Sequence, residues 1–296
     1  MTRTITAGKE KATKLVGAKA VVYAYADRGI AQHEAVHAYC GQTFGRTGPT
    51  WYSEGMAEMG QYWVKGSRAV NTPQQLVKFF REEYRHRQAI DIVNEEQITG
   101  DSWANYTRRW ALCHLLNHNL NYSKRFRWIG KAIVTGQEIN YPELFGARAD
   151  QIEFEYQFFV KRIDIGYRVD LCSWDWEARF LPLAAKPKSV KISARRGWQP
   201  SKASLTAGQK YDYSAKGKWS TGSGEPVDAK GHQDGRGRLM GVLMKDFQLG
   251  EPFELGVYGT FTAPADGHLY LRCRDDWHEI EDNQDHIFVR LKGSDP

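Results

Sequence analysis

Apolar residues recur at helical spacing through the first half of the chain, and they are separated by loops rich in Gly, Thr and Pro. This spacing predicts helices over Ile30 to Cys40, Glu54 to Val64, Gln74 to Arg87, Trp103 to Asn119 and Ile152 to Arg162. The clearest strand signal in this half is Ala18 to Tyr25, directly before the first helix. We therefore expect a mainly helical N-terminal domain.

The pattern changes to short alternating runs after a proline-containing stretch at residues 181–187. These runs predict strands over Val190 to Ala194, Lys210 to Lys216, Leu239 to Lys245, Phe253 to Phe261, His268 to Cys273 and His286 to Leu291. Short strands punctuated by Gly, Asn, Asp and Pro are typical of an antiparallel β-sandwich. The expected fold class is α+β multidomain, with domains at 1–185 and 186–296, although residues 166–184 fit either domain.

Composition places the chain among ordinary globular proteins, because 41% of its residues are hydrophobic and 26% are charged. The net charge of +6 is spread along the sequence. Basic clusters such as Arg81 to Arg87 and Lys124 to Trp128 are interpreted as solvated helix faces, so we expect no nucleic-acid partner. No stretch approaches the roughly 18 apolar residues of a membrane span, so we expect none.

The four cysteines show no C-x-x-C spacing, which argues against a zinc ribbon. Cys40 and Cys113 lie on predicted helices and could pair in an oxidising compartment, a question that the sequence leaves open. Residues 1–14 are polar and lack the apolar core of a signal peptide. They predict either a cytoplasmic protein or a chain that begins downstream of its leader.

An H-E-x-x-H run, His33 to His37, stands within the first predicted helix. This spacing puts two imidazoles on one helix face, where they can bind Zn²⁺, and sets a carboxylate beside them. We expect Glu34 to accept a proton from water activated by the metal, and not to bind the metal itself. The alternative is a pair of structural histidines on an amphipathic helix.

A second segment, Trp51 to Glu58, provides carboxylates at a distance where a third ligand is expected. Glu54 follows a loop that can fold back, so it is the candidate third zinc ligand. Glu58 lies one turn later on the same face, where it could hydrogen-bond the outer nitrogen of a ligand histidine. The alternative for Glu58 is a solvated helix carboxylate.

The developing oxyanion of a hydrolytic reaction needs a hydrogen-bond donor. Tyr106 and His114 are the candidates, because both lie on the helix expected to pack over the site, and Tyr106 is preferred. His114 and His118 also form an H-x-x-x-H pair that suggests a second metal site, although no acidic residue accompanies it.

Residues 30–64 resemble the gluzincin metallopeptidases, and most closely the peptidase-MA-like group, in which H-E-x-x-H is followed by W-x-x-E-G-x-A-E. That element stands here at Trp51 to Glu58. The resemblance implies a zincin-like catalytic domain with His33, His37 and Glu54 as zinc ligands and Glu34 as the base. It thereby implies a zinc-dependent endopeptidase, a hydrolase that acts on a protein or glycoprotein substrate.

An acidic loop at residues 275–283 concentrates oxygen ligands of the kind that Ca²⁺ prefers, although a solvated hairpin tip is the alternative. Residues 189–293 resemble the galactose-binding-like, jelly-roll sandwich of soluble bacterial galactophilic lectins, through Leu-Met-Gly at 239–241, F-x-A-P at 261–264, L-Y-L-R at 269–272 and Asp-Asn at 282–283. The resemblance implies calcium ligands at Asp275, Asp282 and Asn283, and a glycan ligand. Near these calcium ligands, Trp277 could stack on a sugar ring, and His232 and Asp234 could form hydrogen bonds with the sugar.

Together these features predict a two-domain zinc metallopeptidase, secreted or periplasmic by resemblance, that a carbohydrate-binding module anchors to a glycan. The alternative is a non-catalytic glycan-binding protein on a degenerate peptidase scaffold, which the short region before His33 favours. In a third interpretation, the β-module binds the helical domain and stabilises it.

Overall fold

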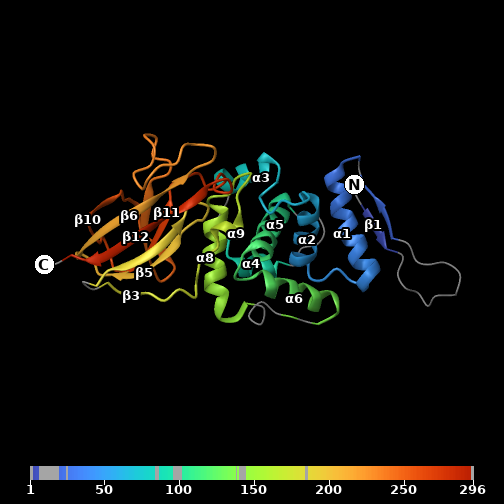
Figure 1. The fold of residues 1–296 in the computed structure, drawn as a ribbon. Coiled ribbons are helices and arrows are strands. Elements are labelled where there is room, and N and C mark those ends of the chain that lie inside the picture. Colours follow the sequence, from blue (N-terminus) through green and yellow to red (C-terminus); the bar gives the residue numbers. More distant parts are fainter. Residues whose placement is uncertain are drawn as a thin grey trace. The chain divides into compact units, whose positions relative to one another are not determined.

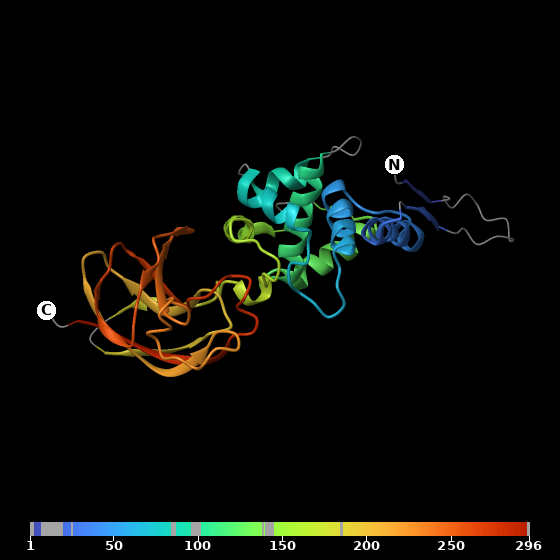
Figure 2. The ribbon, with the colours of Figure 1, turned by 90° about the horizontal axis from the view of Figure 1, so that it is seen from above.

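A computed structural model describes residues 3–6, 20–24, 26–83, 87–95, 102–137, 139, 145–183 and 186–294. The chain divides into two compact units, residues 1–165 and residues 166–296. The first unit is built mainly of helices and the second of strands (Figures 1 and 2). The expected α+β fold is therefore confirmed.

Residues 166–183 belong to the second unit, together with the short helix α9 (Val169–Cys172). Strand β3 (Leu181–Pro182) pairs with β5 (Gln199–Leu205), and the ring of Trp174 lies 4.7 Å from that of Tyr270. These contacts explain why the segment groups with the strands that follow it. The boundary expected at residue 185 itself lies outside the described residues.

Helices make up most of the described part of the first unit (Figure 1). They are α1 (Arg28–Phe44), α2 (Thr50–Gln61), α3 (Gln74–Lys78), the π-helical turn η1 (Phe79–Glu83), α4 (Ala89–Asn94), α5 (Trp103–His118), α6 (Ser123–Val134), the 3₁₀ turn η2 (Gly146–Arg148) and α8 (Ala149–Val160). The hairpin of β1 (Arg3–Thr6) and β2 (Ala20–Tyr23) lies beside α1. From the sequence we did not predict α4, interpreted only Lys124 to Trp128 of α6 as a helix face, and placed the start of α2 four residues late, at Glu54.

Helix α1 has a defined start and end. The side chain of Asp27 accepts a hydrogen bond from the Ile30 N–H at 3.0 Å, which satisfies one of the unpaired donors of the first turn. At the other end Gly45 adopts φ of 78°, and its N–H donates to the Gly41 carbonyl. The H-E-x-x-H run therefore lies in the second and third turns of a capped helix.

Two glycines let α2 pack closely on both sides. A Cβ atom on Gly60 would lie 2.5 Å from Val36 Cγ2 of α1, and one on Gly55 would lie 2.4 Å from Cys113 Sγ of α5. Neither distance is compatible with a side chain larger than hydrogen. Gly55, the residue of the sequence motif, thus allows the approach of α2 to α5, while Gly60 allows the approach to α1.

His114 of α5 is buried and only 4% exposed, and its Nε2 atom has no hydrogen-bond partner within the described chain. Its ring packs against those of Trp110, His118 and Phe159. Burial, together with the neighbouring His118, lowers the pKa of His114 well below its usual value. The ring is therefore part of the helical core and is held neutral there.

This neutral ring makes the helical unit sensitive to acid. Because its pKa is lower in the folded than in the unfolded chain, His114 stabilises the fold above pH 6.5 and loses that contribution as the pH falls, by up to about 1.4 kcal/mol per pH unit. His114→Leu should therefore lose less stability than wild type between pH 7 and pH 5, in urea unfolding followed by helical circular dichroism. The same loss in both proteins would contradict this role.

The second unit contains two sheets (Figure 1). Their strands, besides β3 and β5, are β4 (Lys188–Ser193), β6 (Lys210–Ser220), β7 (Leu239–Lys245), β8 (Gln248–Leu249), β9 (Phe253–Glu254), β10 (Tyr258–Thr262), β11 (Gly267–Cys273) and β12 (Gln284–Gly293). One sheet has the order β10-β6-β12-β4 and the other β3-β5-β11-β7-β8, with β9 on β7. All pairs except β3–β5 are antiparallel.

Inward-facing residues of both sheets form one core, which includes Trp219, Leu269 and Ile287. The indole N–H of Trp219 donates to the Gly237 carbonyl at 2.6 Å, so this large buried side chain is fully satisfied. The predicted strand Phe253 to Phe261 is in fact two strands in different sheets, β9 and β10. With these differences, the antiparallel β-sandwich is confirmed.

Cys40, Cys113, Cys172 and Cys273 are all free thiols, so the pair that the sequence left open is not formed. Within the described ranges no helix combines the length and the apolar character needed to cross a membrane.

Candidate metal centre

Helices α1 and α2 bring three of the predicted side chains together. The Nε2 atoms of His33 and His37 lie 3.2 Å apart, and Glu54 Oε2 lies 3.4 Å from the first and 3.3 Å from the second. Within the described chain this is the one group of three His, Cys, Asp or Glu side chains close enough to share a metal ion. All three are largely buried.

The spacing of these atoms fits a zinc ion. Tetrahedral zinc with ligand bonds of about 2.0–2.1 Å holds its ligand atoms about 3.3 Å apart. The three observed separations, 3.2, 3.3 and 3.4 Å, match one face of such a tetrahedron. A set of two imidazoles and one carboxylate also leaves the fourth position open, as in catalytic zinc sites.

The electrostatics of the cluster favour a cation. Burial acts to lower the pKa of His33, but the hydrogen bonds to Glu54 and Glu58 outweigh it and raise that pKa to about 9. Burial likewise acts to raise the pKa of Glu54, but the two histidines lower it to about 2. Without a metal the carboxylates thus hold a proton on His33, and a divalent ion must displace it.

The outer nitrogens of both histidines lie close to polar side chains of α2. His33 Nδ1 lies 3.1 Å from Glu58 Oε1, and His37 Nδ1 lies 3.2 Å from Ser53 Oγ. Such contacts orient a ligand histidine so that its other nitrogen faces the metal. Glu58 therefore lies beside the outer nitrogen of His33, and its support of a metal ligand stays a prediction. The contact of Ser53 with His37 was not predicted from the sequence. Its position immediately before Glu54 was the one feature that could have indicated it.

Glu58→Gln tests this outer contact. We expect zinc affinity to fall by about 10- to 100-fold, because an amide cannot support His33 Nδ1–H as a carboxylate does. Competition with a chromophoric chelator measures the change. Glu177→Gln, an exposed carboxylate of the other unit, should leave the affinity as in wild type. Equal affinities in all three proteins would remove Glu58 from the site.

Of the two candidate oxyanion donors, Tyr106 lies beside the cluster. Its ring centroid is 6.1 Å from that of His33, because α5 packs against α2 and carries Tyr106 near its start. His114 lies two turns further along α5, in the aromatic core described above. Glu34 lies between the two histidines on α1 and is partly buried.

An apolar cavity of about 330 Å³ adjoins His37. Its walls come mainly from three helices, with Val36, Cys40 and Phe44 on α1, Met56 on α2 and Val134 on α6. The metal cluster is thus bordered by a space that can accept an apolar side chain of a ligand.

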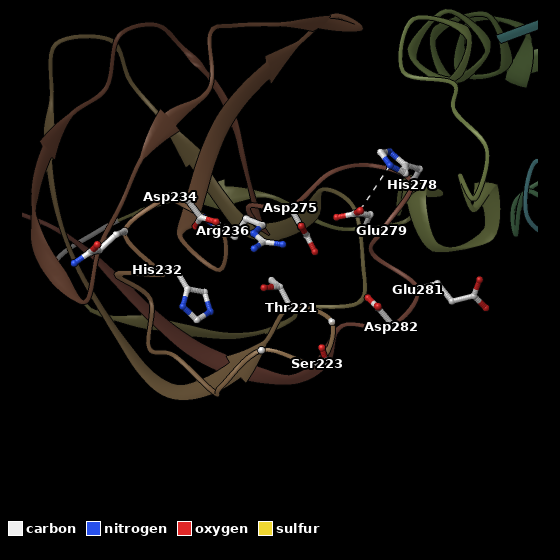
Figure 3. Close-up of a pocket in the computed structure, with 13 residues that line it drawn as sticks. Thr221, Ser223, His232, Asp234, Arg236, Asp275, His278, Glu279, Glu281 and Asp282 are labelled. Carbon is white, nitrogen blue, oxygen red and sulfur yellow. Dashed lines mark hydrogen bonds and ion pairs between the residues drawn. The ribbon is translucent and has the colours of Figure 1, made fainter. Parts of the chain in front are cut away.

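In the second unit, most of the residues predicted to bind calcium or sugar line one large pocket of about 1010 Å³ (Figure 3). His232, Asp234, Asp275 and Asp282 are in its wall, and the carboxylates of Asp275 and Asp282 point into the same space. The sequence did not single out Arg236, which also lines the pocket.

The remaining two predicted residues have other contacts. Asn283 is 2% exposed; its Oδ1 accepts from the Gly222 N–H and its Nδ2 donates to the Ala194 carbonyl, so it holds the loop in place. Trp277 covers the guanidinium of the buried Arg272, 3.6 Å from the ring centroid. The Trp277 ring thus has an arginine contact, and its stacking on a sugar stays a prediction.

No protein-family model and no curated protein sequence matches this chain. Among solved structures, the chain is similar to an EclA N-terminal domain, described as a PllA-like lectin, with 20% identity, a TM-score of 0.31 and coverage of 36% of this chain and 95% of that one. It is also similar to the IMPa metallopeptidase from Pseudomonas aeruginosa, with 13% identity, a TM-score of 0.25 and coverage of 74% of this chain and 27% of that one. A third similar structure is a functionally unknown conserved protein from Bacillus anthracis str. Ames. It has 10% identity and a TM-score of 0.23, and the match covers 38% of this chain and 22% of that one.

Proposed function

We propose that the first unit is a zinc-dependent endopeptidase. The observation that carries the proposal is the triangle of His33 Nε2, His37 Nε2 and Glu54 Oε2, whose edges match tetrahedral zinc, with Glu34 on the same helix as the two histidines. Such a site is suited to hydrolysis by direct attack of water, with no covalent intermediate.

A bound zinc ion would act as a Lewis acid, lowering the pKa of water and polarising the scissile carbonyl. Glu34 would accept the proton of the attacking water and deliver it to the leaving amine. The Tyr106 hydroxyl would donate to the developing oxyanion, since its ring lies beside His33. The cavity against His37 would take an apolar side chain of a protein or glycoprotein substrate.

Metal removal tests this proposal. Cleavage of casein by the purified protein should stop after treatment with 1,10-phenanthroline and dialysis, and it should return with one equivalent of Zn²⁺ but not with Mg²⁺. Cleavage that continues undiminished in the metal-free protein would contradict it.

For the second unit we propose calcium-dependent glycan binding at the large pocket, because Asp275 and Asp282 direct their carboxylates into it beside His232 and Asp234. Such ligands, and glycoprotein substrates, fit a secreted or periplasmic protein. On a glycan array, Asp275→Asn with Asp282→Asn should abolish Ca²⁺-dependent binding, while Asp285→Asn should not. If glycan binding persists without any peptidase activity, the chain is instead a binding protein on a peptidase scaffold.

A further inference from the structure

A second cavity, of about 560 Å³, lies at the opposite end of the sandwich from the large pocket. Strand β7 begins after Arg236, at the large pocket, and ends at Lys245, in the wall of the second cavity. Strand β11 runs the other way, from Gly267 at the second cavity toward Asp275 at the large pocket. The two spaces are therefore separated by the length of the strands.

Aromatic rings form much of this cavity. Trp176 and Phe180 come from the segment before the sandwich, and Phe247 and Tyr270 come from the six-stranded sheet and its β7–β8 turn. The rings of Trp176 and Phe247 lie 5.5 Å apart, and Phe247 is 40% exposed. Tyr270 is buried, whereas the Phe247 ring borders the cavity and stays open to solvent, as is typical of ligand sites.

The turn that carries Phe247 is conformationally costly. Pairing of Lys245 with Gln248 leaves Asp246 and Phe247 as the two central residues, and their φ angles are 49° and 59°. Such a two-residue hairpin favours Asn and Gly, because a side chain with φ above zero is strained. A phenylalanine here is not explained by the turn itself, and strain of this kind is characteristic of functional sites.

Hydrogen-bond acceptors and hydrogen-bond donors both surround the rings. Asp175, Asp246 and Asp266 offer carboxylate oxygens, while Lys245 and His268 offer donors. Asp266 is fixed by the Ala207 N–H at 2.9 Å and by Lys245 at 3.5 Å, and the His268 ring is stacked 4.1 Å from that of Phe180. Asp266 and His268 thus have contacts within the protein that orient them at the cavity.

We propose that this cavity is a second carbohydrate-binding site, in which the apolar face of a pyranose ring lies on Phe247 and Trp176. A sugar presents apolar C–H groups on its face and hydroxyls that both donate and accept at its rim, which matches rings bordered by carboxylates, an ammonium and an imidazole. An organic cation would use the rings and the carboxylates but would leave the donors of Lys245 and His268 without a role, so the test below includes one. The site is independent of the metal centre and of calcium, so it does not rest on the function proposed for either.

The test uses the labelled full chain on a glycan array in EDTA, which silences calcium-dependent binding. We expect binding to arrayed glycans in EDTA that falls at least tenfold in Trp176→Ala with Phe247→Ala. Asp275→Asn with Asp282→Asn should leave it unchanged. Phe288→Ala, which removes another exposed phenylalanine from β12, is the matched control. Thermal unfolding of each variant checks that the sandwich is intact.

Three results would overturn the proposal. They are absence of binding to any arrayed glycan in EDTA, equal binding by wild type and the folded double aromatic variant, and saturable binding of choline at this cavity without sugar binding. Phe247→Gly provides a second variant, since glycine suits the turn; it should be at least as stable as wild type and still lose binding.

Discussion

Glu34→Gln is expected to retain one zinc ion per chain and to cleave peptides about 10³-fold more slowly than wild type. The amide has nearly the size of the carboxylate, but it cannot accept a proton from water or deliver one to the leaving amine. Since His33, His37 and Glu54 are unchanged, the metal cluster should stay assembled. The effect should therefore appear in the rate of cleavage and not in metal content.

The comparison uses casein and a quenched fluorescent peptide, with metal content measured on the same samples. Glu82→Gln, an exposed carboxylate on η1, controls for loss of a negative charge in the same unit. Equal rates for wild type and Glu34→Gln would remove Glu34 from the mechanism. Loss of zinc from the variant would instead make it part of the metal site.

Glu54→Ala is expected to lower zinc affinity by more than about 100-fold. This is a larger loss than that expected for Glu58→Gln, which removes only a contact to the outer nitrogen of His33. Glu54→Ala removes the only oxygen ligand of the cluster and leaves two imidazoles from one helix. Wild-type protein should gain stability from zinc, by about 2.7 kcal/mol at a concentration 100 times the dissociation constant. The variant should show no such gain at that concentration.

Thermal unfolding with and without zinc measures this difference. Gln61→Ala, at the end of the same helix, is the matched control and should respond to zinc as wild type does. Glu54→Asp should recover part of the affinity, because a shorter carboxylate can still reach an ion. An unaltered response to zinc in Glu54→Ala would show that the metal binds elsewhere.

The cluster of His33, His37 and Glu54 could be predicted because its residues are close in sequence. His33 and His37 share one helix, and Glu54 follows after a single loop, so helical spacing and one turn back bring them together. The sandwich was predictable from a different local signal, the short apolar runs between turns that become strands such as β7 and β11. Strand β5 was missed because Gln199, Pro200, Ser201 and Lys202 give no alternating apolar signal.

Features that depend on distant contacts could not be predicted. The role of Trp277 is set by Arg272, which the fold buries beneath it, and nothing in the local sequence shows that burial. Residues 166–183 join the second unit through β3, which pairs with β5, and through Trp174, which contacts Tyr270 almost a hundred residues later. The second cavity is lined in part by Trp176 and Phe180 of the same segment, so it could not be predicted without those contacts.

The most direct test of the metal centre is X-ray absorption at the zinc edge, together with metal content, for the protein purified without added chelator. The proposed site predicts one zinc per chain with two nitrogen ligands, one carboxylate oxygen and a further light atom, and loss of this signal in Glu54→Ala. A zinc-free protein, or a zinc spectrum that is the same in wild type and Glu54→Ala, would contradict it.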